Sequence, residues 1–322
     1  MTEQPVNTGG SMQQKKNVLV IGGNGFIGSN IVEALKNEGF AVAVLDILPP
    51  RFPGRDVQYH CGSVSDRDLL DELIRNRDSL IYLKSSTTPA TSMIDAAKAY
   101  CEDLPELMGV CEVCLQHGVR KIVFSSSGGT VYGDLQVRRP YREEDPTYPR
   151  NHYGIAKVAA ENILLMQNAL HGMENIILRV SNPYGRGQSV LSGVGAITSF
   201  AEKIIHKQPI RIFGDGKFIR DYIDVSDVAR AFVMAAAQTP VNGPPIFNIG
   251  SGRGFSLLQI VDLLQELLQT KAQIEFLPQR EFDVEYNVLD ITKAARILGF
   301  SPAVSPEEGI RRYVQQLSRR GN

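Results

Sequence analysis

Short apolar runs alternate with amphipathic stretches from residue 17 to residue 180, and this alternation constrains the fold more than any other feature. The runs NVLVIG, AVAVLD, VQYHCG, SLIYLK, KIVFSS and NIILRV have the length and composition of strands. Continuous apolar strands separated by helices are typical of a parallel sheet that is covered on both faces. We therefore predict an α/β fold, a doubly wound parallel sheet, with helices at 26–39, 66–77, 94–118 and 152–170.

The pattern changes after residue 180. The segment SNPYGRGQSVLSGVG is rich in turn-forming residues and predicts a long surface loop. The helix SDVARAFVMAAAQ and the strand IFNIG predict returns to the sheet domain near 226–250. The rest of 181–322, including the helices LLQIVDLLQELLQ, TKAARILG and SPEEGIRRYVQQL, is expected to form a smaller C-terminal α/β lobe. A ligand is expected in the cleft between the two lobes.

Charge and composition exclude several classes of partner. The net charge is −1 over 322 residues, so no basic field favours nucleic acid. The apolar runs are too short to span a membrane. Residues 1–16 are polar, lack the apolar core of a signal peptide and are expected to be a disordered arm.

Cys111 and Cys114 form a C-x-x-C pair in a stretch with helical apolar spacing. A zinc site would need a second pair of ligands, which the sequence does not show, so we expect buried thiols and no metal. Without a disulfide framework, the expected location is the reducing cytoplasm.

A glycine-rich loop follows the first strand, in VIGGNGFIG. Gly22, Gly25 and Gly28 stand between a strand and a helix, where glycine permits a tight turn and close approach to a pyrophosphate. The helix N-terminus would add N–H donors and a positive dipole. Asp46 ends the second strand, where a carboxylate can bind ribose hydroxyls and repel a 2′-phosphate. The expected cofactor is therefore NAD, although the nearby Arg51 leaves NADP possible.

Tyr153 and Lys157 are four residues apart and would lie on one face of a helix. The run containing Ser126, Ser127 and Thr130 follows the fifth strand, at the sheet edge where ligands bind. A nearby ammonium, together with the positive nicotinamide ring of NAD⁺, is expected to lower the tyrosine pKa and so create a base that takes a proton from an alcohol. The alternative is a half-buried tyrosine beside a lysine that reaches solvent.

The motifs, taken in order, resemble those of the extended short-chain dehydrogenase/reductases. They are GGNGFIG, Asp46, SSSGGTVYG, YGIAK, SNPYGRGQ, GDGKFIRDYIDVSD and FNIGSG. Within that family the chain is most similar to the nucleotide-sugar 4-epimerases of the UDP-glucose 4-epimerase type. The resemblance extends from about residue 17 to the C-terminus.

The resemblance implies a role for each matching residue. Tyr153 would be the acid/base, Lys157 would bind the nicotinamide ribose and tune the tyrosine, and Ser127 would be the third catalytic member. It also implies a nucleotide-diphosphate sugar, with UDP as the nucleotide, and a homodimer formed through the helices at 94–117 and around Tyr153. The implied cofactor-binding residues are Gly22, Gly25, Phe26, Ile27, Gly28, Asp46, Ser63, Val64, Lys84, Tyr153 and Lys157. The implied substrate-binding residues are Ser127, Thr130, Asn182, Arg220, Arg280, Asp283 and Asn287.

The chain departs from the family pattern in four places. Gly128–Gly129 lengthens the serine run, so spacing alone does not fix the third catalytic hydroxyl. Ser63 replaces the usual adenine-binding Asp. Lys84 stands in a turn that usually has small residues and is expected either to contact phosphate or to point to water. Asn287 replaces a bulky aromatic that restricts the sugar pocket in some members, which predicts acceptance of UDP-N-acetylhexosamines.

Four activities remain open at this stage. The sequence favours a 4-epimerase, because the chain retains Tyr153 and Lys157 and Asp46 favours NAD. A 4-ketoreductase would use the same triad with an exchangeable cofactor. A 4,6-dehydratase would need an Asp-Glu pair where this chain has Gly128–Gly129. A non-catalytic NAD-sensing scaffold would be expected to have lost the tyrosine or the lysine.

Overall fold

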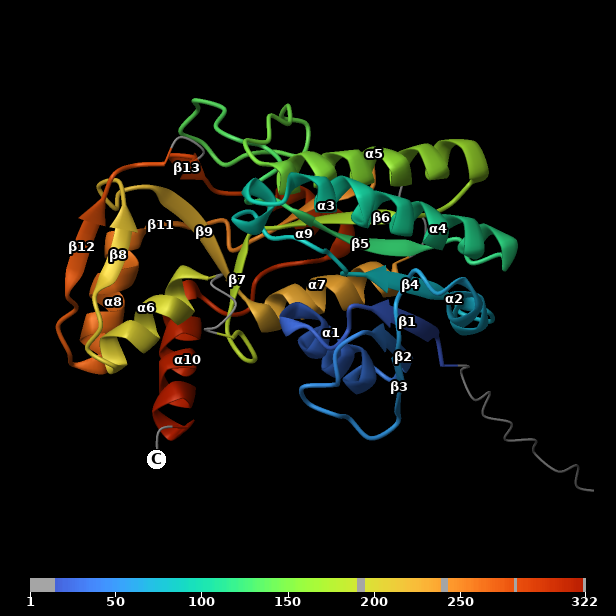
Figure 1. The fold of residues 1–322 in the computed structure, drawn as a ribbon, viewed down its shortest axis with the longest axis horizontal. Coiled ribbons are helices and arrows are strands. Elements are labelled where there is room, and N and C mark those ends of the chain that lie inside the picture. The colour runs from blue at the N-terminus through green and yellow to red at the C-terminus, as the bar shows by residue number, and fades with distance from the viewer. Residues whose placement is uncertain (1–14, 190–194, 239–242, 281–282, 321–322) are drawn as a thin grey trace, which may run out of the picture.

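Seven parallel strands form the sheet that the sequence predicts. The computed structural model describes residues 15–189, 195–238, 243–280 and 283–320, so most of the arm expected at 1–16 lies outside the described residues. The strand order is β10-β6-β5-β4-β1-β2-β3, and each pairing is parallel (Figure 1). The strands are β1 (Asn17–Ile21), β2 (Ala41–Asp46), β3 (Val57–Cys61), β4 (Ser79–Tyr82), β5 (Ile122–Ser127), β6 (Ile176–Val180) and β10 (Ile246–Ile249).

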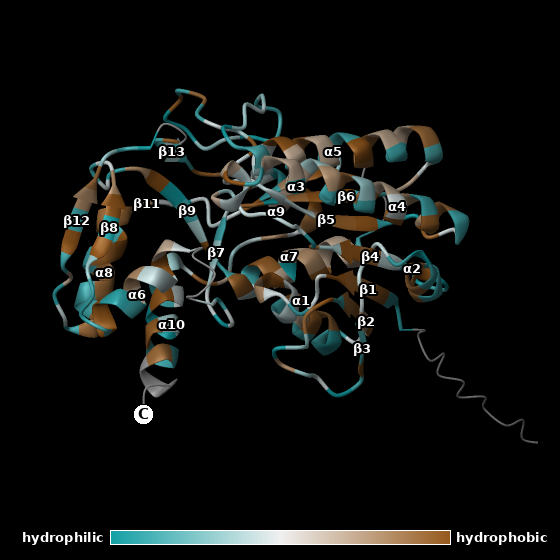
Figure 2. Cartoon of the chain, in the orientation of Figure 1, coloured by the Kyte–Doolittle hydropathy of each residue, from teal (hydrophilic) through white to brown (hydrophobic). Residues whose placement is uncertain are grey.

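Helices cover both faces of this sheet, and each face has its own apolar core. On one face lie α1 (Phe26–Asn37), α7 (Val225–Ala237) and α9 (Thr292–Leu298). On the other lie α2 (Arg67–Ile74), α4 (Asp103–Gln116) and α5 (His152–His171). Figure 2 shows hydrophobic stretches along the strands between these two layers. No helix in the described ranges is long and apolar enough to cross a membrane.

The single helix predicted at 94–118 is two helices. The 3-10 turn η1 (Thr91–Met93) precedes α3 (Ala96–Cys101), and α4 begins at Asp103 after a break at Glu102. Pro105 lacks an N–H group and fits the first turn of a new helix, where that donor has no partner within the helix. Cys111 and Cys114 are buried in α4 as free thiols, as predicted, and burial raises the pKa of Cys111 to about 12.

The smaller lobe packs around a third apolar core. Its helices are α6 (Ala196–Ile205), α8 (Leu257–Leu268) and α10 (Pro306–Arg320). Its strands are β7 (Asn182–Tyr184), β8 (Ile210–Phe213), β9 (Ile219–Asp224), β11 (Gly254–Ser256), β12 (Ile274–Leu277) and β13 (Tyr286–Asn287). The segment predicted as a loop from residue 181 therefore begins as a strand, because β7 pairs with β9 and buries Tyr184. The part of that segment at 190–194 lies outside the described residues.

The two lobes do not divide at one point in the sequence. Helix α7 and strand β10 return to the large lobe, in agreement with the sequence analysis. Helix α9 does so too, which corrects its assignment to the smaller lobe: Ala294 and Leu298 pack in the core beside α7. Buried Asp221 on β9 joins the lobes, since it accepts bonds from the Ser251 N–H at 2.8 Å and the Leu289 N–H at 3.3 Å.

Candidate active site

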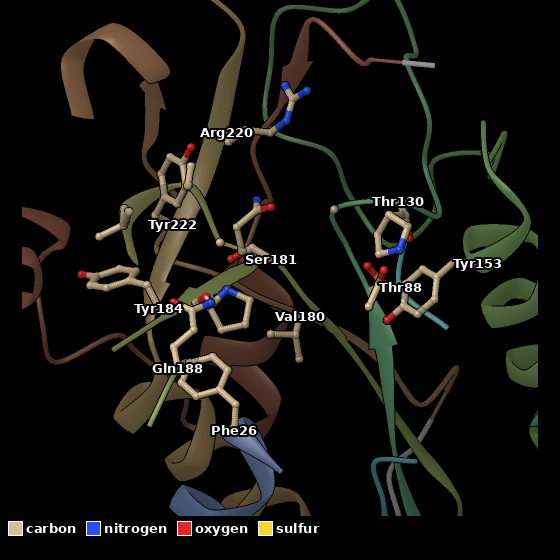
Figure 3. A pocket seen from close by; sticks show the side chains of 18 of the residues that line it. Phe26, Thr88, Thr130, Tyr153, Val180, Ser181, Tyr184, Gln188, Arg220 and Tyr222 are labelled. Atoms are coloured by element: carbon tan, nitrogen blue, oxygen red, sulfur yellow. Dashed lines mark hydrogen bonds between the residues drawn. The ribbon is translucent and has the colours of Figure 1, made fainter. Parts of the chain in front are cut away.

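The main cavity, of about 470 Å³, lies between the lobes at the carboxyl ends of the sheet strands. In Figure 3, Tyr153, Thr88 and Thr130 lie on one side, while Tyr184 and Gln188 lie on the facing side. The sequence-predicted residues that line it are Phe26, Ile27, Ser127, Thr130, Tyr153, Asn182, Arg220, Arg280 and Asp283. A cavity therefore lies between the lobes, where the sequence analysis expects a ligand to bind.

The glycine loop forms a tight turn between β1 and α1. Gly22 has a φ of 80°, which disfavours other residues. A Cβ at Gly28 would lie 2.3 Å from the carbonyl oxygen of Gly22, so the helix packs too closely for a larger residue. No side chain caps α1 at Gly25. The amides of the first helical turn, at Phe26 and Ile27, therefore remain available for an anion.

Asp46 holds the same loop from the end of β2. Its carboxylate accepts the Asn24 N–H at 2.9 Å and the Leu48 N–H at 2.9 Å. Each carboxylate oxygen has a second lone pair, so both contacts are compatible with further bonds to ribose hydroxyls.

Three other residues expected at the cofactor are placed differently from one another. Ser63 is exposed and its hydroxyl accepts the Ser65 N–H at 3.1 Å. Val64 is buried in the core, so only its backbone is available to a ligand. Lys84 does not point to water, which corrects one of its two expectations: its ammonium donates to Asp103 at 3.0 Å and to Glu106, and the residue does not line the main cavity.

Helix α5 positions the tyrosine and the lysine. Asn151 caps it by accepting the Gly154 N–H at 2.8 Å, which fixes the first turn where Tyr153 lies. One turn later Lys157 is buried and donates to the carbonyl oxygen of Ser125 at 2.9 Å. The Lys157 ammonium lies 5.5 Å from the centre of the Tyr153 ring, so the two side chains share one face of the helix as predicted.

In the protein without cofactor, burial is the largest influence on the pKa of Tyr153. Burial and, to a smaller extent, the charge of Asp103 raise the pKa of Tyr153 to about 12, while the nearby Ser127 hydroxyl has the opposite effect. Burial also lowers the pKa of Lys157 to about 8, against the opposing effect of Asp103 and Glu161. Desolvation therefore outweighs the ammonium at this site, and a phenolate requires further positive charge near the ring.

The hydroxyl run after β5 meets the tyrosine at Ser127. The Ser127 hydroxyl lies close enough to Tyr153 to lower its pKa, which singles out this hydroxyl where spacing alone did not. The Thr130 hydroxyl is buried and has no hydrogen-bond partner within the described residues, and Thr130 also lines the cavity. A Cβ at Gly128 would lie 2.6 Å from the Leu289 side chain, so the added glycines keep the run tightly packed.

The smaller lobe contributes the two predicted arginines. Arg220, on β9, donates to the Ile219 carbonyl oxygen at 2.9 Å, and burial lowers its pKa. Arg280 forms a two-bond ion pair with Asp283, at 3.0 and 2.7 Å, and lies 4.4 Å from the centre of the Phe213 ring. Asn182 donates to the Asp221 carbonyl oxygen at 2.8 Å. The structure thus gathers positive charge in the wall of the smaller lobe.

Asn287 does not line the cavity, which corrects the prediction that it faces the sugar. It is fully buried on β13, and its side-chain N–H donates to the Gly128 carbonyl oxygen at 3.0 Å. The pairing of β13 with β9 turns this side chain toward the glycine run. The argument for acetamido sugars from Asn287 therefore fails on geometry.

Several lining residues escaped sequence analysis. They share an aromatic or hydroxyl side chain and were given no role: Thr87, Thr88, Phe200, Phe213, Phe218 and Tyr222, the last two within the motif GDGKFIRDYIDVSD. Alternation within RIF and IRDYI is the signal that would have placed Phe213 and Tyr222 on strands of the smaller lobe, whereas Phe218 directly precedes β9.

Comparison with known proteins agrees with this geometry. Residues 18–250 match the model of the NAD dependent epimerase/dehydratase family. The chain belongs to this family. A UDP-glucose 4-epimerase of Mycolicibacterium smegmatis is 32% identical over 309 residues, which are 92% of this chain and 97% of that protein.

Two further relatives of this epimerase/dehydratase family member are a reductase and a second UDP-glucose 4-epimerase. The dTDP-4-dehydro-6-deoxyglucose reductase of Escherichia coli is 31% identical, over 94% of this chain and 98% of that protein. The structure of the UDP-glucose 4-epimerase of Thermotoga maritima with UDP-glucose is 32% identical. It superimposes with a TM-score of 0.88, covering 95% of this chain and all of that one.

Proposed function

We propose that the protein catalyses the NAD-dependent 4-epimerisation of a UDP-hexose. The observation that carries this proposal is the contact between Tyr153 and Ser127, in a cavity whose opposite lobe supplies Arg220 and Arg280. Tyr153 and Ser127 suit proton transfer at a sugar hydroxyl, and the two arginines suit binding of a diphosphate.

In this proposal Tyr153 takes the proton from the C4 hydroxyl and later returns it to the oxygen of the keto sugar. Ser127 donates a hydrogen bond that orients the same oxygen, and Lys157 supplies positive charge that favours the phenolate. Bound NAD would accept the C4 hydrogen as hydride and return it to the opposite face. Arg220 and Arg280 hold the diphosphate while the sugar turns over.

The glycine loop fits this cofactor. The uncapped first turn of α1 would receive the pyrophosphate, because Phe26 and Ile27 also line the cavity. Asp46 would bind the adenosine ribose and disfavour a 2′-phosphate. We expect the purified protein to release NAD(H) rather than NADP(H) on denaturation.

Elimination of water is disfavoured by the composition of the cavity wall. A 4,6-dehydratase needs a second acid/base pair, and Gly128–Gly129 occupies the expected position. Among the described lining residues the only acid is Asp283, which is paired with Arg280. Ketoreduction is the second candidate, because one relative is a reductase.

A panel of UDP- and dTDP-sugars, including UDP-N-acetylhexosamines and a dTDP-4-keto-6-deoxy sugar, tests the proposal with and without added NAD(P)H. An epimerase converts its substrate to the 4-epimer with no external NAD(P)H, since the cofactor is regenerated in each cycle. Product that forms only when NAD(P)H is added and is a reduced 4-hydroxy sugar would instead establish the reductase. If neither the 4-epimer nor the reduced sugar forms, the epimerase and the reductase activities are both contradicted.

Arg280→Ala should weaken UDP binding by at least about tenfold, because a hydrogen bond to a charged group contributes roughly 1.5–3 kcal/mol. Calorimetry with UDP measures the change. Arg138→Ala is the matched control, since Arg138 pairs with Glu285 at the surface and does not line the cavity. Equal affinities of Arg280→Ala and the control would remove Arg280 from the diphosphate site.

We also propose a cytoplasmic homodimer formed through the outer faces of α4 and α5. These faces expose Met108, Ile155, Met166 and Leu170, on two helices that pack side by side. Met166→Lys should convert dimer to monomer in sedimentation equilibrium. Phe276→Lys is the control, because Phe276 is exposed on β12 in the other lobe. A dimer that persists in Met166→Lys would contradict this interface.

A further inference from the structure

Lys84, Asp103 and Glu106 form a charged cluster beside the Tyr153–Lys157 pair. Their side chains are only 24%, 14% and 14% exposed. Burial lowers the pKa of Lys84, but its hydrogen bonds to Glu106 and Asp103 outweigh burial and raise the pKa overall. The cluster carries one positive and two negative charges, and the mechanism above gives it no role.

A second cavity, of about 10 Å³, connects the cluster to the catalytic pair. Lys84 and Asp103 line it together with Tyr153 and Lys157. Tyr82 also lines this small cavity, and its hydroxyl has no hydrogen-bond partner within the described ranges. Little water fits in so small a space, so charges act across it more strongly than at the surface.

Asp103 also fixes a segment of the main cavity wall. Its carboxylate accepts the Ser86 N–H at 2.8 Å and the Ser85 hydroxyl at 3.1 Å. Ser85 in turn bonds to the carbonyl oxygen of Thr87 at 3.1 Å. Thr87 and Thr88 line the main cavity, and Figure 3 shows Thr88 beside Tyr153.

The charges around Lys157 act in opposite directions. Asp103 and Glu161 raise its pKa, and Lys84 lowers it. Glu161 is neutralised by Arg179 of β6. This leaves the cluster as the source of net negative charge. The titratable groups near Lys157 are Lys84 and Tyr82 from the β4 end, Asp103 from α4, and Tyr153 and Glu161 from α5. Glu106 of α4 joins them through its ion pair with Lys84.

We propose that the Lys84–Asp103–Glu106 cluster is a positioning element for the reaction. Its net negative charge holds Lys157 as an ammonium beside Tyr153, and Asp103 fixes the segment that carries Thr87 and Thr88. The consequence for turnover rests on the proposed function, whereas the effect of charge on Lys157 is a property of the protein alone.

Titration of Lys157 by ¹³C NMR of its ε-carbon tests the charge effect. The resonance is identified by its loss in Lys157→Arg. Asp103→Asn removes a negative charge but keeps the acceptor oxygen, and should lower the Lys157 pKa by about half a unit or more. Lys84→Met removes a positive charge from the same ion pair and should raise it. A purely structural role would give the two variants the same direction of change.

Matched variants keep the test decisive. Glu106→Gln should shift the titration in the same direction as Asp103→Asn, and it replaces that variant if Asp103→Asn does not fold. Glu112→Gln removes an exposed carboxylate of α4 that pairs with Arg67, and should leave Lys157 unchanged. The proposal would be overturned if the Lys157 pKa moved in the same direction in Lys84→Met and in the carboxylate variants, or if it moved in neither.

Steady-state kinetics test whether Asp103 positions Thr87 and Thr88. The KM of Asp103→Ala should be severalfold higher than that of Asp103→Asn, because alanine lacks the oxygen that accepts the bonds from Ser85 and Ser86. Equal KM values would remove the positioning of Thr87 and Thr88 from the proposal. A wild-type protein that epimerises no sugar would contradict the proposed function, while the NMR titration would still decide the charge effect.

Discussion

Tyr153→Phe is expected to fold, to retain NAD and to lose at least about 100-fold in turnover. The substitution keeps the ring and removes the group that exchanges a proton with the sugar, and general acid–base groups contribute about 10²–10⁴-fold. Ser127 would lose its partner, but the packing of α5 on the sheet does not depend on this hydroxyl. Steady-state kinetics and the cofactor content of the purified variant measure both effects.

Tyr148→Phe is the matched control for this substitution. Tyr148 is 65% exposed and does not line the cavity, so its hydroxyl should have no effect on turnover. Near-wild-type turnover in Tyr153→Phe would exclude Tyr153 as the acid/base and with it the proposed mechanism.

Glu161→Gln is expected to cost about 3–5 kcal/mol in the free energy of unfolding, because it leaves a buried guanidinium without its counter-charge. Arg179 and Glu161 are 4% and 2% exposed, and their two-bond contact joins β6 to α5 at 2.7 and 3.0 Å. The Ser126 hydroxyl also donates to Glu161. This pair therefore anchors the helix that carries the catalytic residues.

Urea denaturation of the protein measures this cost. Glu285→Gln serves as the control, because Glu285 pairs with Arg138 at the surface, where such a pair contributes about 0–1 kcal/mol. A loss in Glu161→Gln no larger than in the control would show that the buried pair does not stabilise the fold.

The sequence by itself determined the large lobe and its loop chemistry. The alternation of apolar runs and amphipathic helices predicted the parallel sheet and the returns of α7 and β10. The glycine loop, Tyr153 and Lys157 were found by local patterns, because strand periodicity, turn geometry and one-turn spacing are encoded by neighbouring residues. The break between α3 and α4 also has a local signal in Pro105.

Only the tertiary structure decided which residues meet across the cavity. Asn287 could not be placed from spacing, since its direction depends on the pairing of β13 with β9 and on contact with Gly128, 159 residues away in sequence. Lys84 reaches Asp103 because α4 packs beside the end of β4. Such contacts join segments with no shared pattern. Burial also depends on them, and in the protein without cofactor desolvation raises the Tyr153 pKa.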